Sequence, residues 1–409
     1  MPTQNLTIRT PAGHELTGSL ELPTGLVRGA ALFAHCFTCT KNSKAAVTVT
    51  RALAREGIAT LRFDFTGLGG SGGDFGHQGF AADISDLVAA AEELIARFEQ
   101  PILLIGHSLG GAAVLAAADD IGFARIAAIA TIGAPSDVPH VLENIDGNLD
   151  RIRSEGEGEV SIGGRAFTLR REFIEKVEAA DLLSEVARLR KPLMFLHAPM
   201  DQIVGVEHAS ALFQAAKHPK SFVSLEGADH LLLKEEDAHF VASVIAGWAH
   251  RYLPLRADWP MPEDGIIACT GHGKFGTEVH TVSHQFVADE PKSYGGDDTG
   301  PTPYDLLNAA LGTCTAMTIK MYADRKNWPL EGVSVAVIHE RQHADECDHA
   351  EAMKQGTQMQ SLNRSIAIRG DKLDAEQRAK LMEIADKCPV HRTLEGELHV
   401  HTVQKDIVP

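Results

Sequence analysis

Short apolar runs separated by longer amphipathic stretches make up the chain as far as residue 252. The runs are four to seven residues long and lie at residues 30–35, 58–63, 102–105, 126–132, 193–197 and 221–225. Runs of this length are typical of strands that are buried on both faces of a parallel sheet. The stretches between them, such as 79–98 and 231–252, have helical periodicity. This alternation predicts an α/β fold with a doubly wound, mostly parallel sheet.

Two segments depart from the alternation. Residues 6–9 and 14–22, on either side of Pro11-Ala12-Gly13, predict an antiparallel hairpin at the sheet edge. Residues 136–190 are highly charged and predict a small cap over the strand ends. The cap arginines leave two interpretations open: a solvated helical surface, which is favoured, or a binding site for an anionic substrate.

A change of pattern divides the chain. Residues 253–264 (LPLRADWPMPED) hold three prolines, which exclude a helix or a central strand and predict a linker. Domains are therefore expected at 1–252 and 265–409. The second has two long helices, at 303–326 and 375–387, and strand-like runs at 266–270, 278–287, 333–339, 366–369 and 398–403. Strands around a pair of helices predict an α+β domain.

Composition narrows the function classes. Hydrophobic residues make up 44% and charged residues 23%, as in a globular protein. No apolar run reaches the roughly 18 residues of a membrane helix, and the first residues do not resemble a secretory signal. The net charge of −17 argues against a nucleic-acid partner. We expect a cytoplasmic protein with no membrane span, no cofactor and no metal, whose six cysteines are too sparse for a disulfide scaffold.

The sequence Gly106-His107-Ser108-Leu109-Gly110 follows the apolar run at 102–105 and opens a helical pattern at 111–118. A strand, a sharp turn and a helix form the context in which Gly-x-Ser-x-Gly presents a nucleophilic serine. The turn is too tight for side chains at positions 106 and 110, which are therefore glycine. Backbone N–H groups at the start of the helix are then able to stabilise an oxyanion.

A serine hydroxyl needs a base to remove its proton, and the base needs an acid to orient it. Asp201 follows the run at 193–197, and His230 follows the run at 221–225. Both therefore lie at strand ends, in the chain order serine, acid, histidine. Asp229 is a second acid, but an adjacent residue reaches its neighbour's ring poorly. These positions predict a catalytic triad of Ser108, Asp201 and His230.

Over residues 5–252 the chain resembles the α/β-hydrolase fold family. Besides the serine motif, the similar segments are DFTGLGGS at 64–71 and His35-Cys36-Phe37. The resemblance implies hydrolysis of a carboxylic ester, thioester or related acyl bond, with the N–H groups of Phe37 and Leu109 as the oxyanion hole. Cys36 stands where members usually carry glycine. The small cap favours small or medium acyl substrates.

Each of two polar segments has two possible interpretations. Cys36 and Cys39 form a Cys-x-x-Cys that is either a redox pair or, as is favoured, two small buried thiols. Residues 339–349 (HERQHADECDH) are either a zinc site or, as is favoured, a solvated loop.

In the C-terminal half, the helical pattern at 303–326 places its apolar residues on one stripe. The spacings of 4, 3, 4 and 3 predict a buried central helix with Cys314 on its inner face; the stripe is Leu307, Leu311, Cys314, Thr318 and Met321. Cys388 precedes Pro389, where the second helix must end. On composition alone both cysteines are ordinary core residues.

Residues 300–317 (GPTPYDLLNAALGTCTAM) and 387–394 (KCPVHRTL) resemble the OsmC/Ohr family of thiol peroxidases, and the resemblance covers about 265–409. It implies an intertwined α+β homodimer that reduces organic hydroperoxides at the expense of a thiol reductant. Cys314 matches the peroxidatic cysteine and Cys388 the resolving one. Arg341, Arg364 and Arg392 are candidates for the activating arginine.

The leading hypothesis is a serine hydrolase of small-molecule acyl esters fused to an OsmC-like domain, which assembles as a homodimer or higher homo-oligomer through that domain. Two alternatives stay open. In the first alternative, the chain is primarily a thiol-dependent peroxidase of organic hydroperoxides. In the second, the C-terminal half is only an assembly module for the hydrolase.

Overall fold

The computed structural model describes residues 2–36, 39–73, 80–139, 142, 145–162, 165–178, 181–253, 262–271, 273–343 and 358–404. The chain divides into two compact units, Met1–Gly300 and Pro301–Pro409. The predicted linker at 253–264 lies mostly outside the described residues, so the predicted domain boundaries stay a prediction.

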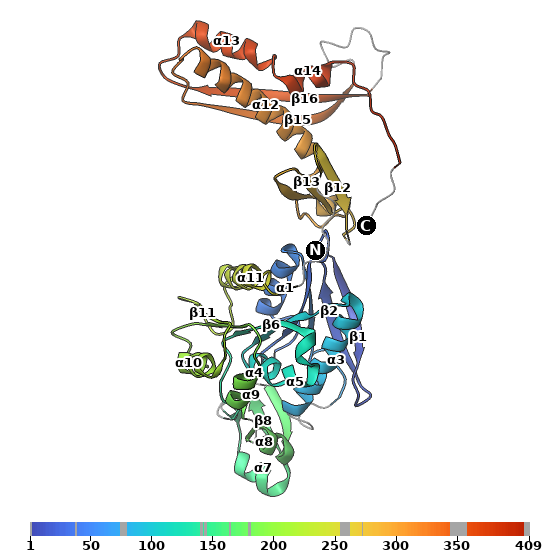
Figure 1. Ribbon diagram of the computed structural model, residues 1–409, viewed down its shortest axis with the longest axis vertical. Helices are drawn as coiled ribbons and strands as arrows, with labels where there is room; N and C mark the ends of the chain where they lie inside the picture. The colour runs from blue at the N-terminus through green and yellow to red at the C-terminus, as the bar shows by residue number, and fades with distance from the viewer. Residues whose placement is uncertain are drawn as a thin grey trace. The chain divides into compact units, whose positions relative to one another are not determined.

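An eight-stranded sheet forms the centre of the first unit (Figure 1), with the order β1-β2-β4-β3-β5-β6-β10-β11. Its strands are β1 (Thr3–Arg9), β2 (Glu15–Glu21), β3 (Gly29–Ala34), β4 (Ile58–Phe63), β5 (Ile102–His107), β6 (Ile126–Ile132), β10 (Leu193–His197) and β11 (Lys220–Ser224). Six of these strands, β4, β3, β5, β6, β10 and β11, run parallel to one another. The other two, β1 and β2, form an antiparallel hairpin at one edge, and β2 pairs antiparallel with β4. The predicted α/β fold, with its edge hairpin, is confirmed.

Helices cover both faces of the sheet because the strand side chains alternate between them. Leu103 and Ile105 of β5 pack on the face covered by α1 (Lys44–Arg55) and α11 (Glu235–Ala249). Ile102 and Leu104 pack on the opposite face. That face is covered by α3 (Phe80–Phe98), α4 (Leu109–Ala116), α9 (Leu182–Arg188) and α10 (Val206–Ala215). Two short helices, α5 (Ala118–Ile121) and η1 (Phe123–Arg125), connect α4 to β6. Both faces are apolar, which explains the uninterrupted apolar runs.

A small three-stranded sheet and helices form the segment between β6 and β10. They are β7 (Ile145–Asp146), α7 (Leu149–Glu155), β8 (Glu157–Ile162), β9 (Arg165–Arg170) and α8 (Arg171–Glu178), followed by α9. This is the segment where the sequence predicts a cap.

The first unit also contains a three-stranded antiparallel sheet, β12 (Ile266–Thr270), β13 (Thr277–Thr281) and β14 (Gln285–Ala288), followed by the turn η2 (Lys292–Tyr294). Glu278 on β13 is buried and joins this sheet to the segment before β3. Its carboxylate accepts hydrogen bonds from the Leu26 N–H at 3.1 Å and from the Arg28 guanidinium at 3.1 Å. The predicted single strand at 278–287 is therefore two strands of a hairpin.

In the second unit, β15 (Gly332–His343) and β16 (Gln358–Arg369) form an antiparallel pair. Its helices are α12 (Pro303–Arg325), α13 (Ala375–Ala385) and α14 (Pro389–Glu395). Thr302 and Asp305 form a capping box at the start of α12. Two long helices and antiparallel strands confirm the predicted α+β class.

The predicted buried stripe of α12 is wrong in part. The buried positions are Leu311, Gly312, Thr315, Ile319 and Ala323, so Thr315 rather than Cys314 is at the centre of the buried face. The prediction assumed that the helix is covered all round. Met321 is instead 64% exposed, because α12 packs on other elements along only one side. Residues 398–403, predicted as a strand, have no regular structure, and Val400 is 84% exposed.

Candidate active sites

Ser108 occupies a strained turn between β5 and α4. Its φ of 55° and ψ of −125° are rare for a residue with a side chain. The Ser108 N–H donates to the Ile132 carbonyl at 2.8 Å, which ties the turn to the neighbouring strand β6. Leu109 begins α4, so its N–H is a first-turn donor that has no acceptor within the helix. The turn holds the hydroxyl at the helix N-terminus.

Close backbone contacts explain both glycines of the motif. A Cβ on Gly106 would lie 2.2 Å from the Gly110 carbonyl oxygen, and a Cβ on Gly110 would lie 2.4 Å from the His35 carbonyl oxygen. Both separations are shorter than a van der Waals contact allows. The turn that presents Ser108 therefore requires glycine at both positions.

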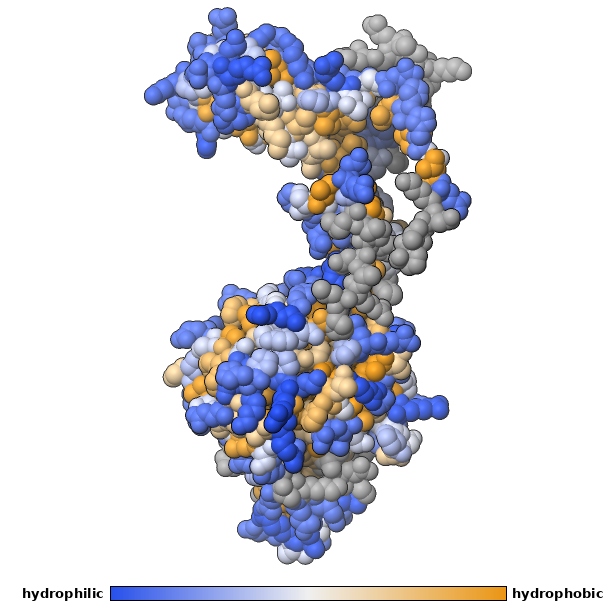
Figure 2. Space-filling model, in the orientation of Figure 1, coloured by the Kyte–Doolittle hydropathy of each residue, from blue (hydrophilic) through white to orange (hydrophobic). Residues whose placement is uncertain are grey.

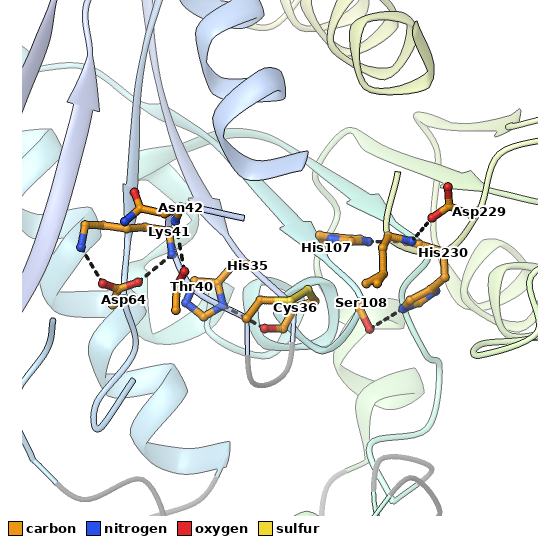
Figure 3. The surroundings of a disulfide bond; sticks show 12 residues. His35, Cys36, Thr40, Lys41, Asn42, Asp64, His107, Ser108, Asp229 and His230 are labelled. Carbon is orange, nitrogen blue, oxygen red and sulfur yellow. Dashed lines mark hydrogen bonds and ion pairs between the residues drawn. A yellow bond between two sulfur atoms is a disulfide. The ribbon is translucent and has the colours of Figure 1, made fainter. Parts of the chain in front are cut away.

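The structure brings Ser108, His230 and Asp201 into one hydrogen-bonded line (Figure 3 draws Ser108 with His230). His230 Nε2 lies 3.0 Å from Ser108 Oγ, and its Nδ1 lies 2.7 Å from Asp201 Oδ2. Asp201 follows β10 and His230 follows β11. Asp229 points elsewhere, because its carboxylate accepts hydrogen bonds from the Leu231 and Leu233 N–H groups.

Asp201 is held as a carboxylate. Its second oxygen accepts hydrogen bonds from the N–H groups of Ile203 at 2.9 Å and Val204 at 3.0 Å. Burial by itself raises the pKa of Asp201, but these bonds and the one to His230 outweigh it and leave the pKa below its ordinary value. A fixed negative charge beside Nδ1 keeps the imidazole proton on that nitrogen and leaves Nε2 free to accept a proton from Ser108.

His107 is a site residue that sequence reasoning missed. Its Nε2 donates to the His230 carbonyl at 2.7 Å, and it is buried. Burial first, and then the nearby His230, lowers the pKa of His107 from 6.5 to about 4. His107 is therefore neutral and holds the backbone of the base. As the variable position of Gly-x-Ser-x-Gly, it gave no sequence signal.

The loop after β3 contains the other predicted oxyanion donor. Phe37 lies outside the described residues. Cys36 and Cys39 on either side of it form a disulfide. The favoured interpretation of two free thiols is therefore wrong, because the two Cα atoms lie 5.3 Å apart, within bonding range. Figure 3 shows Cys36 between His35 and Ser108.

Arginines of the cap are largely engaged in ion pairs. Arg151 pairs with Glu155, Arg170 with Glu157 and Arg188 with Glu185, while Arg153 pairs with both Asp150 and Glu178. Paired arginines on an exposed surface support the solvated interpretation over the binding of an anionic substrate.

Cys314 and Cys388 come together in the second unit. The Cys388 sulfur accepts a hydrogen bond from the His391 N–H at 3.3 Å. Burial by itself raises the pKa of Cys388, but the His391 N–H and the nearby Cys314 and Thr315 side chains together lower it. Cys388 is fully buried, whereas Cys314 on α12 is partly exposed. The Cys314 side chain is thus a neighbour of Cys388, as expected of the predicted pair.

Of the three candidate arginines, Arg364 lies beside this pair. Its guanidinium donates to Thr315 Oγ1 at 2.9 Å and pairs with Asp386 at 2.6 Å, and Thr315 is one of the side chains that lower the pKa of Cys388. The side chain of Arg341 lies outside the described residues. Arg392 lies on α14, four residues after Cys388. Arg364 is the candidate that contacts Thr315, the residue next to Cys314.

The histidine-rich segment carries no metal site that the structure describes. Among the described residues, no group of three or more histidine, cysteine, aspartate or glutamate side chains is placed to hold a metal ion. The ring of His339 stacks on that of Tyr304, with centroids 4.1 Å apart. Cys347 and His349 lie outside the described residues.

A mostly parallel sheet, a serine on a strand–turn–helix junction and a histidine and an aspartate at neighbouring strand ends define the α/β-hydrolase class. The chain belongs to the alpha/beta hydrolase family, whose model matches residues 26–273. Residues 295–403 match the family described as OsmC-like protein. Both predicted resemblances are therefore confirmed as domains of one chain.

Comparison with known proteins points to acyl hydrolases. The crystal structure of an esterase domain from Rhodothermus marinus is 48% identical and covers 62% of this chain and 100% of that one, with a TM-score of 0.52. The mitochondrial palmitoyl-protein thioesterase ABHD10 of Rattus norvegicus is 24% identical over 220 residues, which are 52% of this chain and 73% of that protein. Est1E from Butyrivibrio proteoclasticus with bound ferulic acid, 22% identical over 60% of this chain and 98% of that one, with a TM-score of 0.51, shares the fold.

None of the helices within the described ranges combines the length and apolar content needed to cross a bilayer.

The lowered pKa of His107 makes the stability of the fold depend on pH. Between pH 6.5 and about 4 the unfolded chain binds a proton at this residue that the folded chain does not. The free energy of unfolding should therefore fall as the pH drops through this window, by about 3 kcal/mol for this residue. Above pH 6.5 and below about pH 4, the contribution of His107 to the free energy of unfolding does not change with pH.

Urea unfolding at a series of pH values measures this loss. His107→Gln removes the titrating group, so the variant should lose less stability than the wild type across the window. His250→Gln, which changes an exposed histidine, should retain the wild-type slope. Equal slopes for wild type and His107→Gln would show that another group carries the effect.

Proposed function

We propose that the chain is a serine hydrolase that cleaves carboxylic esters or thioesters of small to medium acyl groups. His230 Nε2 removes the Ser108 proton as Oγ attacks the acyl carbon, and it then protonates the leaving alcohol or thiol. Asp201 orients the imidazole and stabilises its positive charge. The N–H groups of Leu109 and Phe37 stabilise the oxyanion. Water, activated by His230, then releases the acid.

The 3.0 Å approach of His230 Nε2 to Ser108 Oγ carries this proposal. The distance lies within the reach of a general base, and the base is itself oriented by Asp201. The similarity to an esterase domain and to a palmitoyl-protein thioesterase supports acyl transfer to water. It also supports testing oxygen esters and thioesters side by side.

Replacing the nucleophile tests the proposal. Ser108→Ala should lower kcat for p-nitrophenyl acyl esters by at least about a thousandfold, because the attacking oxygen is lost. Initial rates over a panel of esters and thioesters measure the effect. Undiminished turnover by Ser108→Ala would exclude the proposed nucleophile.

Two neighbouring acids provide a matched control. Asp201→Asn should also lose most of its kcat, because the asparagine cannot hold the Nδ1 proton in the same way. Asp229→Asn should stay within a few fold of the wild type, because the Asp229 carboxylate caps a turn. Equal losses in both variants would mean that the acid is wrongly assigned.

We propose further that the OsmC-like domain reduces organic hydroperoxides. Cys314, as a thiolate, attacks the terminal peroxide oxygen and becomes a sulfenic acid while an alcohol leaves. The Cys388 thiol then condenses with it, which releases water and forms a disulfide. A thiol reductant restores both cysteines. The influence of the neighbouring Cys314 side chain on the pKa of Cys388 supports this second activity.

Two observations bear on which sulfur attacks. Cys314 is partly exposed and so is accessible to a peroxide, whereas Cys388 is fully buried. The lowered pKa belongs to Cys388, and it supports a thiolate within the pair. We assign the attack to Cys314 because the substrate must reach the sulfur.

Single cysteine variants separate these roles. Cys314→Ser should consume no organic hydroperoxide, whereas Cys388→Ser should consume one equivalent and then stop, because its sulfenic acid has no partner. Loss of tert-butyl hydroperoxide, followed without and with dithiothreitol, gives both results. If the wild type consumes none, the domain is an assembly module without this activity.

The second unit is also proposed to form a homodimer. Few of its residues are fully buried, and its main cluster is Ile319, Ala323, Leu373, Leu381 and Ala385. Large apolar side chains stay on its surface, where Figure 2 shows hydrophobic residues. They include Met317, Met321, Ile338, Leu398 and Val400. A second copy of the unit would cover such residues.

Light scattering on the full chain should therefore give twice the 44.0 kDa mass of one chain. Met321→Glu should shift the equilibrium toward the monomer, because it would place a charge in the contact. Lys320→Glu, at the adjacent exposed position, should leave the dimer intact. A wild-type mass of a single chain at micromolar concentration would exclude the dimer.

A further inference from the structure

One arginine of the second unit joins the two segments that carry its cysteines. Arg364 lies on β16, and its side chain is only 12% exposed. One of its guanidinium nitrogens, Nη1, donates to Thr315 Oγ1 at 2.9 Å and to the Ala385 carbonyl at 3.1 Å. The other, Nη2, pairs with the Asp386 carboxylate at 2.6 Å. A single side chain thus links β16, α12 and the end of α13.

The first of these segments is the buried face of α12. Thr315 is fully buried and follows Cys314 in the sequence. Its hydroxyl donates to the Leu311 carbonyl at 2.8 Å, so the oxygen is left as an acceptor for Arg364. Cys314 and Thr315 share one peptide unit within a continuous helix. A contact that fixes Thr315 therefore also fixes the backbone of Cys314.

The second segment is the turn between α13 and α14. The Cys388 N–H donates to the Ala385 carbonyl at 3.4 Å, so this oxygen accepts from both Cys388 and Arg364. Cys388 is also the N-cap of α14, where its sulfur accepts from the His391 N–H. The position of the Cys388 sulfur therefore follows the position of this turn. Arg364 holds the turn at Ala385 and Asp386.

These contacts indicate a task that differs from activation of a thiol. A cation activates a thiol through its charge, which favours the thiolate. The described hydrogen bonds of Arg364 end on oxygen atoms of Thr315, Ala385 and Asp386, and its charge is paired with a carboxylate. Their effect is geometric, because they hold the segment of Cys314 at a set distance from the segment of Cys388.

The spacing matters in the step that joins the two cysteines. In the proposed cycle, an organic hydroperoxide has already oxidised Cys314 to a sulfenic acid and left as an alcohol. The Cys388 sulfur then bonds to the Cys314 sulfur, the S–O bond breaks, and the hydroxyl leaves as water with the Cys388 proton. The two sulfurs must approach to a bond length of about 2 Å. The first step needs Cys314 and the peroxide alone, so the spacing does not enter it.

We propose that Arg364 is a positioning residue that sets the spacing of Cys314 and Cys388 for disulfide formation. The proposal rests on the peroxidase function proposed above for the OsmC-like domain. The planar guanidinium presents several N–H donors in a fixed fork, which suits it to acceptors on two separate segments. A lysine ammonium keeps the charge but lacks this fork.

Equilibrium with glutathione measures the spacing without any peroxide. The full-length protein is equilibrated at a series of ratios of reduced to oxidised glutathione. Free thiols are then alkylated in denaturant, and peptide mass spectrometry gives the fraction of Cys314–Cys388 disulfide. Arg364→Ala should make this disulfide about tenfold less favourable, because the effective concentration of one thiol at the other falls. For a two-electron couple this is a rise of about 30 mV in reduction potential.

Peroxide kinetics give a second measurement, which separates the two steps. After one equivalent of tert-butyl hydroperoxide, dimedone should trap a sulfenic acid at Cys314 in Arg364→Ala, because condensation with Cys388 is slowed by about tenfold. The wild type should proceed to the disulfide. The rate of hydroperoxide loss in the first turnover should change little. A slower first step with unchanged condensation would make Arg364 an activating residue and would overturn the positioning role.

Matched variants separate positioning from a general loss of stability. Arg378→Ala removes an arginine of α13 that donates to the Ile368 and Gly370 carbonyls, at 2.9 and 2.6 Å, and it should keep the wild-type potential. Thr315→Val removes the acceptor on α12 and should give part of the Arg364→Ala effect. The two effects should not add in the double variant, because both break one contact. If Arg364→Ala misfolds, as judged by circular dichroism, Thr315→Val decides the proposal.

The outcomes separate this proposal from the function on which it rests. If the wild type consumes no tert-butyl hydroperoxide, the peroxidase function fails, and the glutathione equilibrium still tests the spacing. A wild-type potential in Arg364→Ala, or an equal shift in Arg378→Ala, would overturn the positioning role alone. Arg364→Lys should resemble Arg364→Ala. Full rescue by lysine would show that the charge of Arg364, and not the spacing, is what matters.

Discussion

The hydrogen bond between Asp201 and His230 is the interaction on which the proposed hydrolase site depends. It fixes the proton on His230 Nδ1, and only then does Nε2 face Ser108 as an acceptor. The sheet order makes this possible, since β5, β6, β10 and β11 are neighbours and parallel, so the loops after them open at one edge. The N–H groups of Ile203 and Val204 then hold the carboxylate in place. His107 donates a hydrogen bond to the His230 carbonyl and so holds the backbone of the base in place.

Much of the first unit is predictable from sequence because its signals are local. The bounds of β4, β6 and β10 follow the apolar runs, since each strand is buried on both faces. The second unit is harder to predict, because its apolar residues are not all buried within its own chain. The stripe on α12 suggested burial of Met321, which is exposed, and the alternation at 398–403 suggested a strand that this chain does not form. Patterns that a partner is expected to satisfy cannot be assigned from one chain alone.

The candidate sites show the same division. Chain order and strand ends were enough to bring Ser108, Asp201 and His230 together, because the chemistry requires those residue types at those places. His107 was not predictable, since its role is a contact with a backbone carbonyl far along the chain. The state of Cys36 and Cys39 depends on a distance between side chains, and Cys-x-x-Cys is compatible with two thiols, a bridge or a metal site. The contact of Arg364 with Thr315, beside Cys314, likewise joins residues far apart in the sequence.

Gly110 joins the turn that presents Ser108 to the end of β3. Its missing side chain lets α4 begin directly after Ser108, and the same space is filled by the carbonyl groups of Ala34 and His35. The turn that presents Ser108 and the backbone at the end of β3 therefore share one close contact. A side chain at position 110 would therefore disturb the nucleophile turn and the end of β3 together, which is why the second glycine of the motif is needed as well as the first.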